Sequence, residues 1–427
     1  MLKVAEHKAP QDSLETEKFL SAQKLYLPVS QHTGRPSRIC VEKNQIVEKN
    51  QLIARGDGLI SASLHAPQKA KIVDIKNWYH PKLKKIQSLI LKTQPETENR
   101  EPLPALLNLD KTSKENLLKT ISENGIVGMG GAGFPSHVKL NPPKKIDTLI
   151  INGCECEPYL ASDCRLMIEN LEGILKGIEI ISKLIAPEKI IFAVEGNKKE
   201  AIKKINLFLH TKKNNSKIEL RVLKSRYPQG GEKQLIYSVT QRKLSGKMLP
   251  FDAGCMVHNV ATCYAIYKAV YFNQPLTSRV VTFCGDALVK PKNLWVNIGT
   301  TLSELVEKEI IKFKKIPKKI IFGGPMMGDA VTNLANPILK TTSGVLFLEK
   351  LPKEEEESAC IRCGRCVNYC PMNLVPLEYA KMAKNKKYQG LKSYYIKDCI
   401  ECGSCSYICP ANIPILDYIK LGKEKIK

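Results

Sequence analysis

The sequence has few aromatic rings, no long apolar run and no apolar stretch at its start. Only two of its 427 residues are Trp and 6% are aromatic, too few rings for a surface that stacks nucleic-acid bases. No segment approaches the roughly 18 apolar residues of a membrane-spanning helix, and residues 190–194 have only the length of a strand. The opening MLKVAEHKAP lacks the apolar core of a signal peptide. We therefore expect an intracellular protein, soluble or peripheral to a membrane.

Arginine is scarce although the chain is strongly basic. Lys and Arg number 66 against 42 acidic residues, a formal charge of +24, yet only 11 of the 66 are Arg. Nucleic-acid recognition favours Arg forks, so we expect no nucleic-acid partner. Two interpretations of the lysine excess stay open: a compositional drift, which we favour, and attraction to an anionic membrane or acidic partner.

Fifteen cysteines without a secretory signal do not suit a disulfide framework. Eight of them form two copies of the motif C-x-x-C-x-x-C-x-x-x-C-P. In such motifs three neighbouring thiolates bind three corners of a [4Fe–4S] cube, and the cysteine before proline completes the other cube. The spacing therefore predicts two clusters, with these ligands: Cys360, Cys363, Cys366 and Cys409 for the first, and Cys399, Cys402, Cys405 and Cys370 for the second.

Zinc is the alternative metal for these cysteines. Zinc modules pair C-x-x-C units across long spacers, whereas this motif has triplets followed by C-P, so we favour iron. Clusters with four thiolate ligands have no open coordination position, and their chemistry is electron transfer. Cys154, Cys156 and Cys164 lie outside the motif, and we interpret them as buried thiols rather than a third metal site.

The rest of the chain divides by its hydrophobic pattern. Its 43% apolar and 25% charged residues are ordinary for a globular protein. Short β-like runs predict a β-sandwich of the barrel-sandwich hybrid type, and strands alternating with helices, one of them at 166–184, predict an α/β flavin- or nucleotide-binding domain. A β-grasp module with a helix at 302–313 follows. The expected multidomain α/β plus β fold comprises an N-terminal segment without regular structure (1–27), the sandwich (28–94), a linker (95–104), the α/β domain (105–270), the β-grasp module (271–335) and a two-cluster ferredoxin-like domain (350–427).

A glycine-rich loop precedes the first strand of the α/β domain. It contains Gly128, Gly130, Gly131 and Gly133. The loop resembles a dinucleotide fingerprint but follows a helix instead of a strand, so the match alone is weak. The strand at 148–152 ends in Asn152, followed by Glu155 and Glu157, and Glu232 follows another strand. Carboxylates at strand ends beside a phosphate-binding loop predict a nucleotide or flavin pocket, and flavin links two-electron donors to one-electron clusters.

Several motifs occur in an order found in a known protein family. They are GMGGAGFPSHVKL (128–140), NGCECEP (152–158), YPQGGEKQLI (227–236), HNVAT (258–262) and GGPMMG (323–328). The first four resemble the NADH- and FMN-binding subunit of respiratory complex I. All of them, with the doubled ferredoxin motif, resemble more closely the C subunits of Rnf ion-translocating electron-transport complexes, from about residue 30 to 418. The sequence is identified as a member of that family.

The resemblance implies cofactors and the residues around them. The implied cofactors are two [4Fe–4S] clusters and FMN, with NAD(H) as substrate. By motif position, the flavin phosphate and the nicotinamide side are held by Gly128, Gly130, Gly131, Gly133 and Phe134. The other residues around the flavin are Asn152, Glu155, Glu157, Tyr227, Glu232, Asn259 and Thr262, and Lys139 falls where complex I also carries a lysine.

The resemblance also implies a setting. It is a peripheral subunit on the cytoplasmic side of a bacterial inner membrane, in an oxidoreductase complex that couples electron flow between ferredoxin and NAD(H) to ion transport. The implied partners are the other Rnf subunits and ferredoxin. Two departures concern NADH: Lys233 replaces a glutamate of complex I, and Cys154-Glu155 replaces an Asp-Glu pair. Two alternatives stay open: an iron–sulfur relay without nucleotide binding, and a soluble NADH–flavin dehydrogenase.

Overall fold

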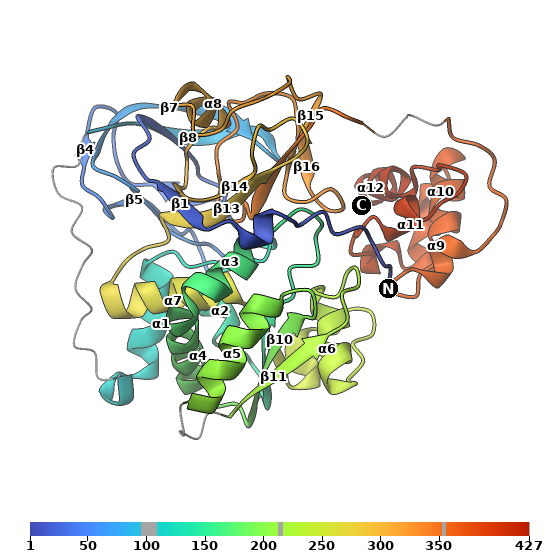
Figure 1. Cartoon of the computed structure of the whole chain (residues 1–427), viewed down its shortest axis with the longest axis horizontal. Coiled ribbons are helices and arrows are strands. Elements are labelled where there is room, and N and C mark those ends of the chain that lie inside the picture. Colours follow the sequence, from blue (N-terminus) through green and yellow to red (C-terminus); the bar gives the residue numbers. More distant parts are fainter. Residues whose placement is uncertain (95–108, 212–216, 352–355, 427) are drawn as a thin grey trace.

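The computed structural model describes residues 1–94, 109–211, 217–351 and 356–426. Figure 1 shows a body with β-strands in its upper half and an α/β unit in its lower half, and a separate group of helices, coloured red, at one side. The N-terminus lies beside that group. The linker expected at 95–104 lies outside the described residues. Within the described ranges, no helix is both long and apolar enough to cross a membrane.

A four-stranded parallel sheet forms the centre of the α/β unit. Its strands lie in the order β11 (Ile218–Leu223), β10 (Lys189–Glu195), β9 (Thr148–Gly153) and β12 (Cys255–Asn259). β9 and β10 are apolar and almost fully buried, which is typical of parallel strands between helices. The chain order reverses between β9 and β12, and open α/β sheets bind ligands at the carboxyl ends of strands at such a reversal.

Helices surround this sheet and build the C-terminal group. In the α/β unit they are α1 (Lys114–Glu123), α2 (Ser136–Lys139), α3 (Ser162–Glu169), α4 (Leu171–Ile185), α5 (Lys199–Thr211), α6 (Glu232–Thr240) and α7 (Val260–Phe272). In the C-terminal group, called the cluster module below (residues 356–426), they are α9 (Arg365–Asn368), α10 (Pro376–Lys384), α11 (Ser404–Tyr407) and α12 (Ile415–Lys425). Short 3-10 helices lie at η1 (Gln11–Ser13), η2 (Leu109–Lys111), η3 (Pro250–Ala253), η4 (Tyr388–Tyr394) and η5 (Ile396–Asp398).

The helix expected at 166–184 is two helices, α3 and α4, which meet at Asn170. The break lets the first half reach further partners. α4 packs closely on α7, since a Cβ on Gly177 would collide with the carbonyl of Cys263, whereas α3 contacts α5, β13 and η1 in addition to α7. Amphipathic periodicity continues across the break, so the sequence pattern does not reveal it.

The N-terminal β-sandwich has two small sheets. One contains β2 (Lys24–Pro28), β8 (Lys84–Thr93), β7 (Ala70–His80) and β4 (Ile46–Val47), and the other contains β3 (Arg38–Ile39), β5 (Leu52–Arg55) and β6 (Leu64–His65). All pairings are antiparallel. Leu25, Leu27, Ile53 and Leu64 are fully buried between the sheets.

The fourth sheet, which has six strands, takes them from distant parts of the chain. Its order is β1 (Thr16–Phe19), β14 (Lys292–Asn297), β13 (Ser278–Cys284), β17 (Gly344–Leu348), β15 (Lys319–Phe322) and β16 (Asp329–Val331). It thus extends past residue 335. β1 pairs in parallel with β14, so the N-terminal segment has the regular structure that we did not expect. Asn293 holds this segment further, because its Nδ2 donates to the carbonyls of Gln11 and Leu14 at 2.9 and 3.0 Å.

Helix α8 (Leu302–Glu307) is shorter than the helix expected at 302–313. It ends at Lys308, and Glu309 takes a left-handed φ of 55°. Ile311 then enters the core, and Phe313 pairs with Leu288 in an isolated bridge. Apolar residues that fit a helical pattern therefore reach the core from a loop.

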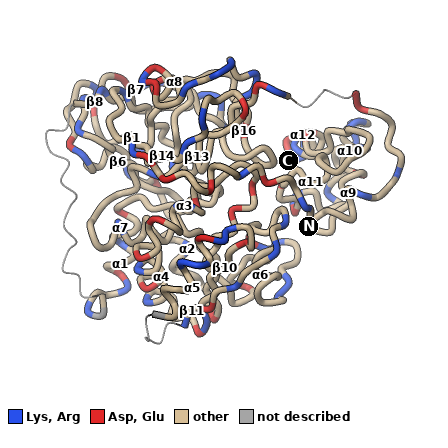
Figure 2. The backbone as a smooth tube through the Cα atoms, in the orientation of Figure 1, with Lys and Arg blue, Asp and Glu red and all other residues tan. Residues whose placement is uncertain are grey.

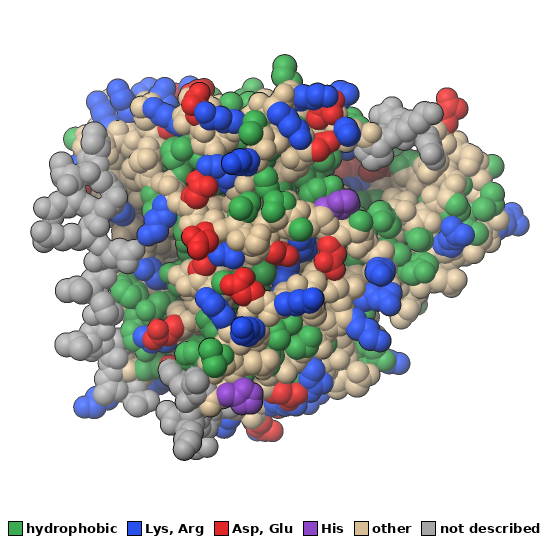
Figure 3. All heavy atoms as spheres, in the orientation of Figure 1, with side chains coloured by type: hydrophobic (Ala, Val, Ile, Leu, Met, Phe, Trp, Pro, Cys, Tyr) green, Lys and Arg blue, Asp and Glu red, His purple; other side chains and the backbone are tan. Residues whose placement is uncertain are grey.

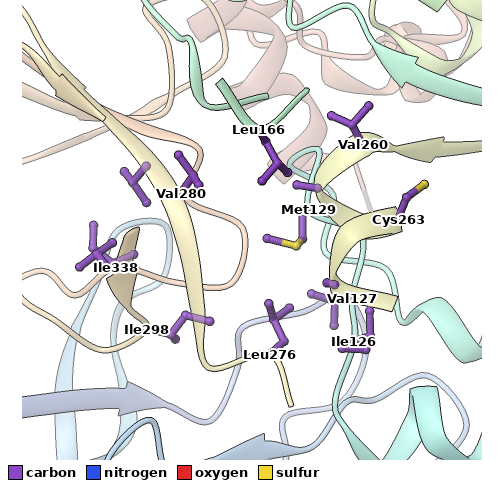
Figure 4. Close-up of a cluster of buried hydrophobic side chains, with 14 of the residues drawn as sticks. Ile126, Val127, Met129, Leu166, Val260, Cys263, Leu276, Val280, Ile298 and Ile338 are labelled. Atoms are coloured by element: carbon purple, nitrogen blue, oxygen red, sulfur yellow. The ribbon is translucent and has the colours of Figure 1, made fainter. Parts of the chain in front are cut away.

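One hydrophobic core runs through all four sheets, with Leu27 of β2, Ile53 of β5, Ile151 of β9 and Val281 of β13 among its members. The cluster module has a core of its own, which includes Tyr379 and Ile419. Figure 4 shows where side chains of the α/β unit meet those of the six-stranded sheet and its loops: Ile126, Val127, Met129 and Leu166 lie on one side and Leu276, Val280, Ile298 and Ile338 on the other, while Cys263 points away from this group.

Charged side chains are spread over the surface. Figure 2 shows Lys and Arg on nearly every part of the chain with Asp and Glu among them, and the face in Figure 3 has the same mixture. Many are paired, for example Lys145 with Glu188 at 2.8 Å and Lys189 with Glu219 at 2.6 Å. This distribution favours compositional drift over a dedicated basic face.

Candidate functional site

The glycine loop lies at the carboxyl edge of the parallel sheet, beside β12 and the start of α7. The N–H of Gly128 donates to the carbonyl of Phe134 at 2.8 Å, and the N–H of Gly133 donates to the carbonyl of Gly128 at 3.2 Å. Thr262, in the first turn of α7, accepts a hydrogen bond from the N–H of Met129 at 2.9 Å. These bonds close the loop and fix it against the positive end of a helix.

The tip of the loop is open. Gly130, Gly131 and Ala132 are exposed, and within the described part of the chain their N–H groups have no hydrogen-bond partner. Gly131 has a φ of +111°, and a Cβ there would meet nothing within 4 Å. A Cβ on Gly130 would press on the side chain of Asn259 at 3.3 Å. Three such amides beside a helix N-terminus fit a phosphate group, so the loop fits the phosphate of a flavin nucleotide.

Two further segments meet the loop region. Lys139, at the end of α2, pairs with Glu232, at the start of α6, with 2.7 Å between Nζ and Oε1. Asn152, near the end of β9, donates through Nδ2 to the carbonyl of Gly230 at 2.9 Å. Lys233 has a different partner, the carbonyl of Gly246 at 2.6 Å. The structure thus brings the 128–140, 152–158 and 227–236 motifs to one edge of the sheet.

Glu155 is buried and fully engaged. Its carboxylate accepts hydrogen bonds from the N–H groups of Asp163 and Cys164 at 2.9 and 3.2 Å, and lies 3.6 Å from the Nζ of Lys198. Burial opposes its charge, but the positive charges of Lys8 and Lys198 lower the pKa of Glu155 below its usual value. The Nζ of Lys8 also donates to the carbonyls of Glu155 and Leu160.

Sequence reasoning missed both lysines. Lys198 has no exposed side-chain surface and also lies 3.5 Å from Asp12 of η1. Burial opposes its charge, but the carboxylates of Glu155 and Asp12 raise its pKa. The one available signal was its place three residues after Glu195, the end of β10, at the same sheet edge as Glu155. Lys8 gave no signal.

Asn259 caps α7 and binds a buried acid. Its Oδ1 accepts from the N–H of Ala261 at 2.9 Å, and its Nδ2 donates to Asp163 at 2.6 Å. Burial and the charge of Glu155 raise the pKa of Asp163 to about 7. His258, next to Asn259, is buried, and burial lowers its pKa well below the usual value. Both polar ends of Asn259 are therefore occupied within the protein.

Glu157 holds the GGPMMG turn at residues 323–328. Its carboxylate accepts hydrogen bonds from the N–H groups of Met326 and Met327 at 3.2 and 2.8 Å. Gly324 is required for this approach, because a Cβ there would collide with the carboxylate. Burial raises the pKa of Glu157 to about 7, in spite of the two hydrogen bonds.

Tyr227 joins the α/β unit to the cluster module. It is buried, and its hydroxyl donates to the carbonyl of Cys402 at 2.8 Å. Its backbone exchanges two hydrogen bonds with Leu2, each of 2.8 Å. Burial raises the pKa of Tyr227 above its usual value, so the phenol keeps its proton and remains a donor.

The two cysteine motifs fold alike. Gly364 and Gly403 have φ angles of 72° and 74°, and Arg362 and Glu401 both have 54°. A short helix follows each glycine, α9 in the first copy and α11 in the second. Arg and Glu rarely adopt a left-handed backbone conformation. Its occurrence at the same position of both copies indicates that the motif requires this backbone.

The structure brings one of the predicted ligand sets into a single pocket. Its sulfur lining comes from Cys370, Cys399, Cys402 and Cys405, and Tyr379 is part of its wall. Cys370 belongs to the first motif and the other three belong to the second. These are the four residues predicted for the second cluster, and a pocket with four thiols and an otherwise largely apolar wall fits an iron–sulfur cube.

The other ligand set is less enclosed. Cys366 and Cys409 lie in the core of the cluster module, and burial, with the nearby thiols of Cys409 and Cys360, raises the pKa of Cys366. Cys360 and Cys363 are exposed. The structure thus brings Cys360, Cys366 and Cys409 near one another, with Cys363 beside them in the chain.

The motif spacing, not a measured sulfur geometry, separates the two metals. Among the residues that the structure describes, no three His, Cys, Asp or Glu side chains form a site for one metal ion. A single zinc ion would hold its thiolates at about 2.3 Å from one centre, whereas a cube binds each thiolate at a separate corner. Triplets of cysteines followed by C-P are typical of cubes. Cys154 and Cys164, outside the two motifs, are buried thiols.

Three family models match the chain. The RnfC barrel sandwich hybrid domain matches residues 2–96, the Nuo51 FMN-binding domain matches residues 121–268, and a 4Fe-4S dicluster domain matches residues 359–413. They cover the β-sandwich, the α/β unit with its glycine loop, and the cluster module. These matches confirm the three parts of the predicted fold and support FMN and [4Fe–4S] clusters as cofactors.

The relatives settle the family. The C subunit of a proton-translocating ferredoxin:NAD(+) oxidoreductase complex from Clostridium ljungdahlii is 43% identical over 375 residues, which cover 87% of this chain and 81% of the relative. The chain belongs to the RnfC family. Another member is the C subunit of an ion-translocating oxidoreductase complex from Rhodobacter capsulatus, which is 37% identical over 87% of this chain and 72% of the relative. The corresponding subunit from Pseudomonas aeruginosa is 36% identical over 88% of this chain and 49% of the relative. The family inferred from the motifs is confirmed.

This RnfC family member also resembles solved structures. A chain of an NAD+-reducing [NiFe]-hydrogenase in the air-oxidised state has a TM-score of 0.50 and 16% identity, over 73% of this chain and 66% of that chain. The same enzyme in the H2-reduced state has a TM-score of 0.51 and 18% identity, over 73% of this chain and 64% of that chain. At this identity the likeness shows a shared fold alone, and it spans less than two thirds of the hydrogenase chain.

Proposed function

We propose that this chain is an electron-transfer subunit of a membrane-bound, ion-translocating oxidoreductase complex. It passes electrons between NAD(H), FMN and two [4Fe–4S] clusters. Its partners are the other Rnf subunits, because its relatives are named as C subunits of such complexes. One observation carries the proposal: an α/β unit with an open glycine loop and a module with two cysteine sets are joined in one chain, where the Tyr227 hydroxyl reaches the backbone of Cys402.

The glycine loop binds the flavin phosphate. The exposed N–H groups of Gly130, Gly131 and Ala132 would hold it when FMN is bound, and the hydrogen bonds among Gly128, Gly133 and Phe134 close the loop. FMN, when bound, supplies the exchange between two-electron and one-electron chemistry. Two side chains set the position of the loop. Thr262 accepts a hydrogen bond from the N–H of Met129, and the side chain of Asn259 packs against Gly130.

The carboxylates of the NGCECEP segment position the pocket and do not contact the flavin. Glu155 is neutralised by Lys8 and Lys198, and Glu157 is bound to the 323–328 turn. The partly exposed pair of Lys139 and Glu232 stays available at the rim, and we assign it to the nicotinamide side of the pocket.

An iron–sulfur relay without flavin is the second candidate. Lys233 favours it, because this lysine stands where complex I carries a glutamate and here bonds to Gly246. The engagement of Glu155 and Glu157 favours it too. In this second candidate the two clusters are the redox groups, since we interpret the cysteines outside the two motifs as free thiols without a redox role.

The remaining assignments are proposals supported by the sheet topology and by the names of the relatives. We propose a β-grasp module built on β13, β14 and β15 with α8, to which β17 and β1 add strands, beside the domains at 28–94, 105–270 and 350–427. We place the subunit on the cytoplasmic face of a bacterial inner membrane, where NAD(H) and ferredoxin occur, with ferredoxin as a further electron partner. The names of the relatives support a subunit of a complex over a free-standing dehydrogenase.

FMN binding by anaerobically purified protein tests the flavin assignment. We expect about one FMN per chain after reconstitution. Gly131→Asp puts a carboxylate into the open space at the loop tip and lowers FMN affinity at least roughly tenfold, about 1.4 kcal/mol. Gly131→Asn has the same shape and backbone cost without the charge and is the matched control. Flavin-free wild-type protein favours the relay, and equal affinities of the two variants contradict the phosphate site.

A further inference from the structure

The cluster module contacts the α/β unit through the loops of one cysteine set. The Tyr227 hydroxyl bonds to the carbonyl of Cys402. The Nε2 of Gln234, in α6, donates to the carbonyl of Pro371, the residue after Cys370, at 3.1 Å. Both Cys402 and Cys370 line the pocket of the second set, so two contacts from the 227–236 motif end at its ligand loops.

A third contact comes from the GGPMMG turn. A Cβ on Gly403 would lie 2.9 Å from the carbonyl of Met326, so the turn packs directly on the loop after Cys402. The turn is held by Glu157 of the NGCECEP segment. The second set is therefore linked to the sheet edge by two separate chain segments.

The seam between these parts is apolar and closed. Leu2, Tyr227 and Cys402 are buried together in one hydrophobic cluster. Partly buried side chains complete it: Val4, Cys156, Met326, Ile400 and Ile408. Cys156 belongs to the segment that follows β9, so the seam extends from the pocket edge to the second cysteine set, with the Glu157 carboxylate at its side, bound to Met326 and Met327.

The first cysteine set faces outward. Cys360 and Cys363 are exposed, the Ile361 side chain between them is 68% exposed, and Arg362 is exposed too. Figure 1 shows α11, of the second motif, on the side of the module nearer the body, and α9, of the first motif, on the outer side. The described contacts of the α/β unit with cysteine loops involve the second set.

We infer that the cluster of Cys370, Cys399, Cys402 and Cys405 is the one next to the flavin pocket, and that the cluster of Cys360, Cys363, Cys366 and Cys409 is the outer one, which exchanges electrons with another protein of the complex. This rests on the proposed function. Each transfer oxidises the donor by one electron and reduces the acceptor by one, and no bond or proton changes at the clusters. Tyr227 is a positioning residue: it acts on the inner cluster through the backbone of Cys402.

Solvent accessibility of the two clusters tests their order in the full chain. The clusters are reduced with dithionite, and the microwave-power saturation of their paramagnetic resonance signals is compared with and without a soluble dysprosium complex. Cys363→Ser identifies the outer signal, because only that cluster loses a ligand. We expect the dysprosium complex to raise the half-saturation power of the outer signal several-fold more than that of the inner one. A stronger effect on the inner signal overturns the order.

Tyr227→Phe tests the positioning role. It keeps the ring and removes one donor, so we expect the reduction potential of the inner cluster to fall while that of the outer cluster stays constant. Tyr407→Phe, at an exposed tyrosine in α11, is the control and shifts neither. A shift of the outer cluster alone, or no shift, contradicts the role. Both tests use dithionite instead of NADH, so failure of NADH to reduce the protein would count against the proposed function only.

Discussion

Lys198 is fully buried and charged, and its carboxylate partners come from distant parts of the chain. Glu155 follows β9, and Asp12 belongs to η1 near the N-terminus. A buried charge is tolerated only when it is paired, so this lysine joins the N-terminal segment to the pocket edge. The N-terminal segment is therefore held by electrostatics as well as by β1.

Replacement of Lys198 by Met leaves Glu155 with one lysine fewer in a buried position. We expect a loss of about 3–5 kcal/mol, because an unpaired buried charge costs that much, and hence a fall of about 4–7 °C in the calorimetric unfolding temperature of a body of this size. Lys199→Met, at an exposed neighbour, is the matched control and changes little. Equal unfolding temperatures for the two variants would show that the buried network contributes nothing.

At the residue scale, the sequence predicted where groups lie better than what they bind. The ends of β9 and β10 place Glu155 and Glu195 at one edge of the sheet, as any parallel sheet would. The partner Lys8 is 147 positions from Glu155 and has no pattern around it, so the engagement of Glu155 was not predictable. The cysteines differ, because their spacing alone encodes which thiols meet.

The GGPMMG turn is the element that connects the pocket edge to the cluster module. Glu157 binds two of its N–H groups, and Met326 packs on Gly403. Burial raises the pKa of Glu157 to about 7, so between its unfolded value near 4.5 and 7 the folded protein binds more protons than the unfolded chain. The stability that this group contributes is therefore present at low pH and is lost as pH rises toward 7.

Glu157→Gln removes this dependence. Between pH 4.5 and 7 the free energy of unfolding of the wild type should fall with rising pH more steeply than that of the variant, by up to about 1.4 kcal/mol per pH unit, and its unfolding temperature should fall accordingly. Asp163 and Glu195, whose pKa values are also raised to about 7, titrate in both proteins, so the comparison isolates Glu157. Glu115→Gln, at an exposed acid in α1, should keep the wild-type slope. Parallel curves for the wild type and Glu157→Gln would refute the assignment.

At the element scale, periodicity located the buried strands and the longer helices. β9, β10 and α6 have clear patterns, and the structure has them near the expected residues. β1 has only four residues, and Phe19 is the one that is buried. Its sequence therefore lacks the alternation of apolar and polar residues that predicts a strand. The break at Asn170 and the early end of α8 are set by packing partners, which a local pattern does not contain.

At the scale of the whole molecule, four sheets share one core and the cluster module has a core of its own. The sequence indicated separate domains because composition and pattern change along the chain. Packing between them depends on pairs such as Met129 and Val280, which belong to segments far apart in the sequence (Figure 4). The body therefore offers a single platform, on which the module docks by its second cysteine set.

The whole molecule is, on our proposal, a path for electrons from NADH through flavin to two clusters. The most direct test is spectroscopy of the anaerobic full-length chain, reconstituted with FMN, after addition of NADH and then of dithionite. We predict about eight irons per chain and bleaching of the flavin absorbance by NADH. We also predict that NADH reduces part of the clusters, that dithionite reduces the rest, and that the paramagnetic resonance signals grow accordingly. Flavin that NADH leaves oxidised, or protein that holds zinc and shows no resonance after dithionite, would contradict the proposal.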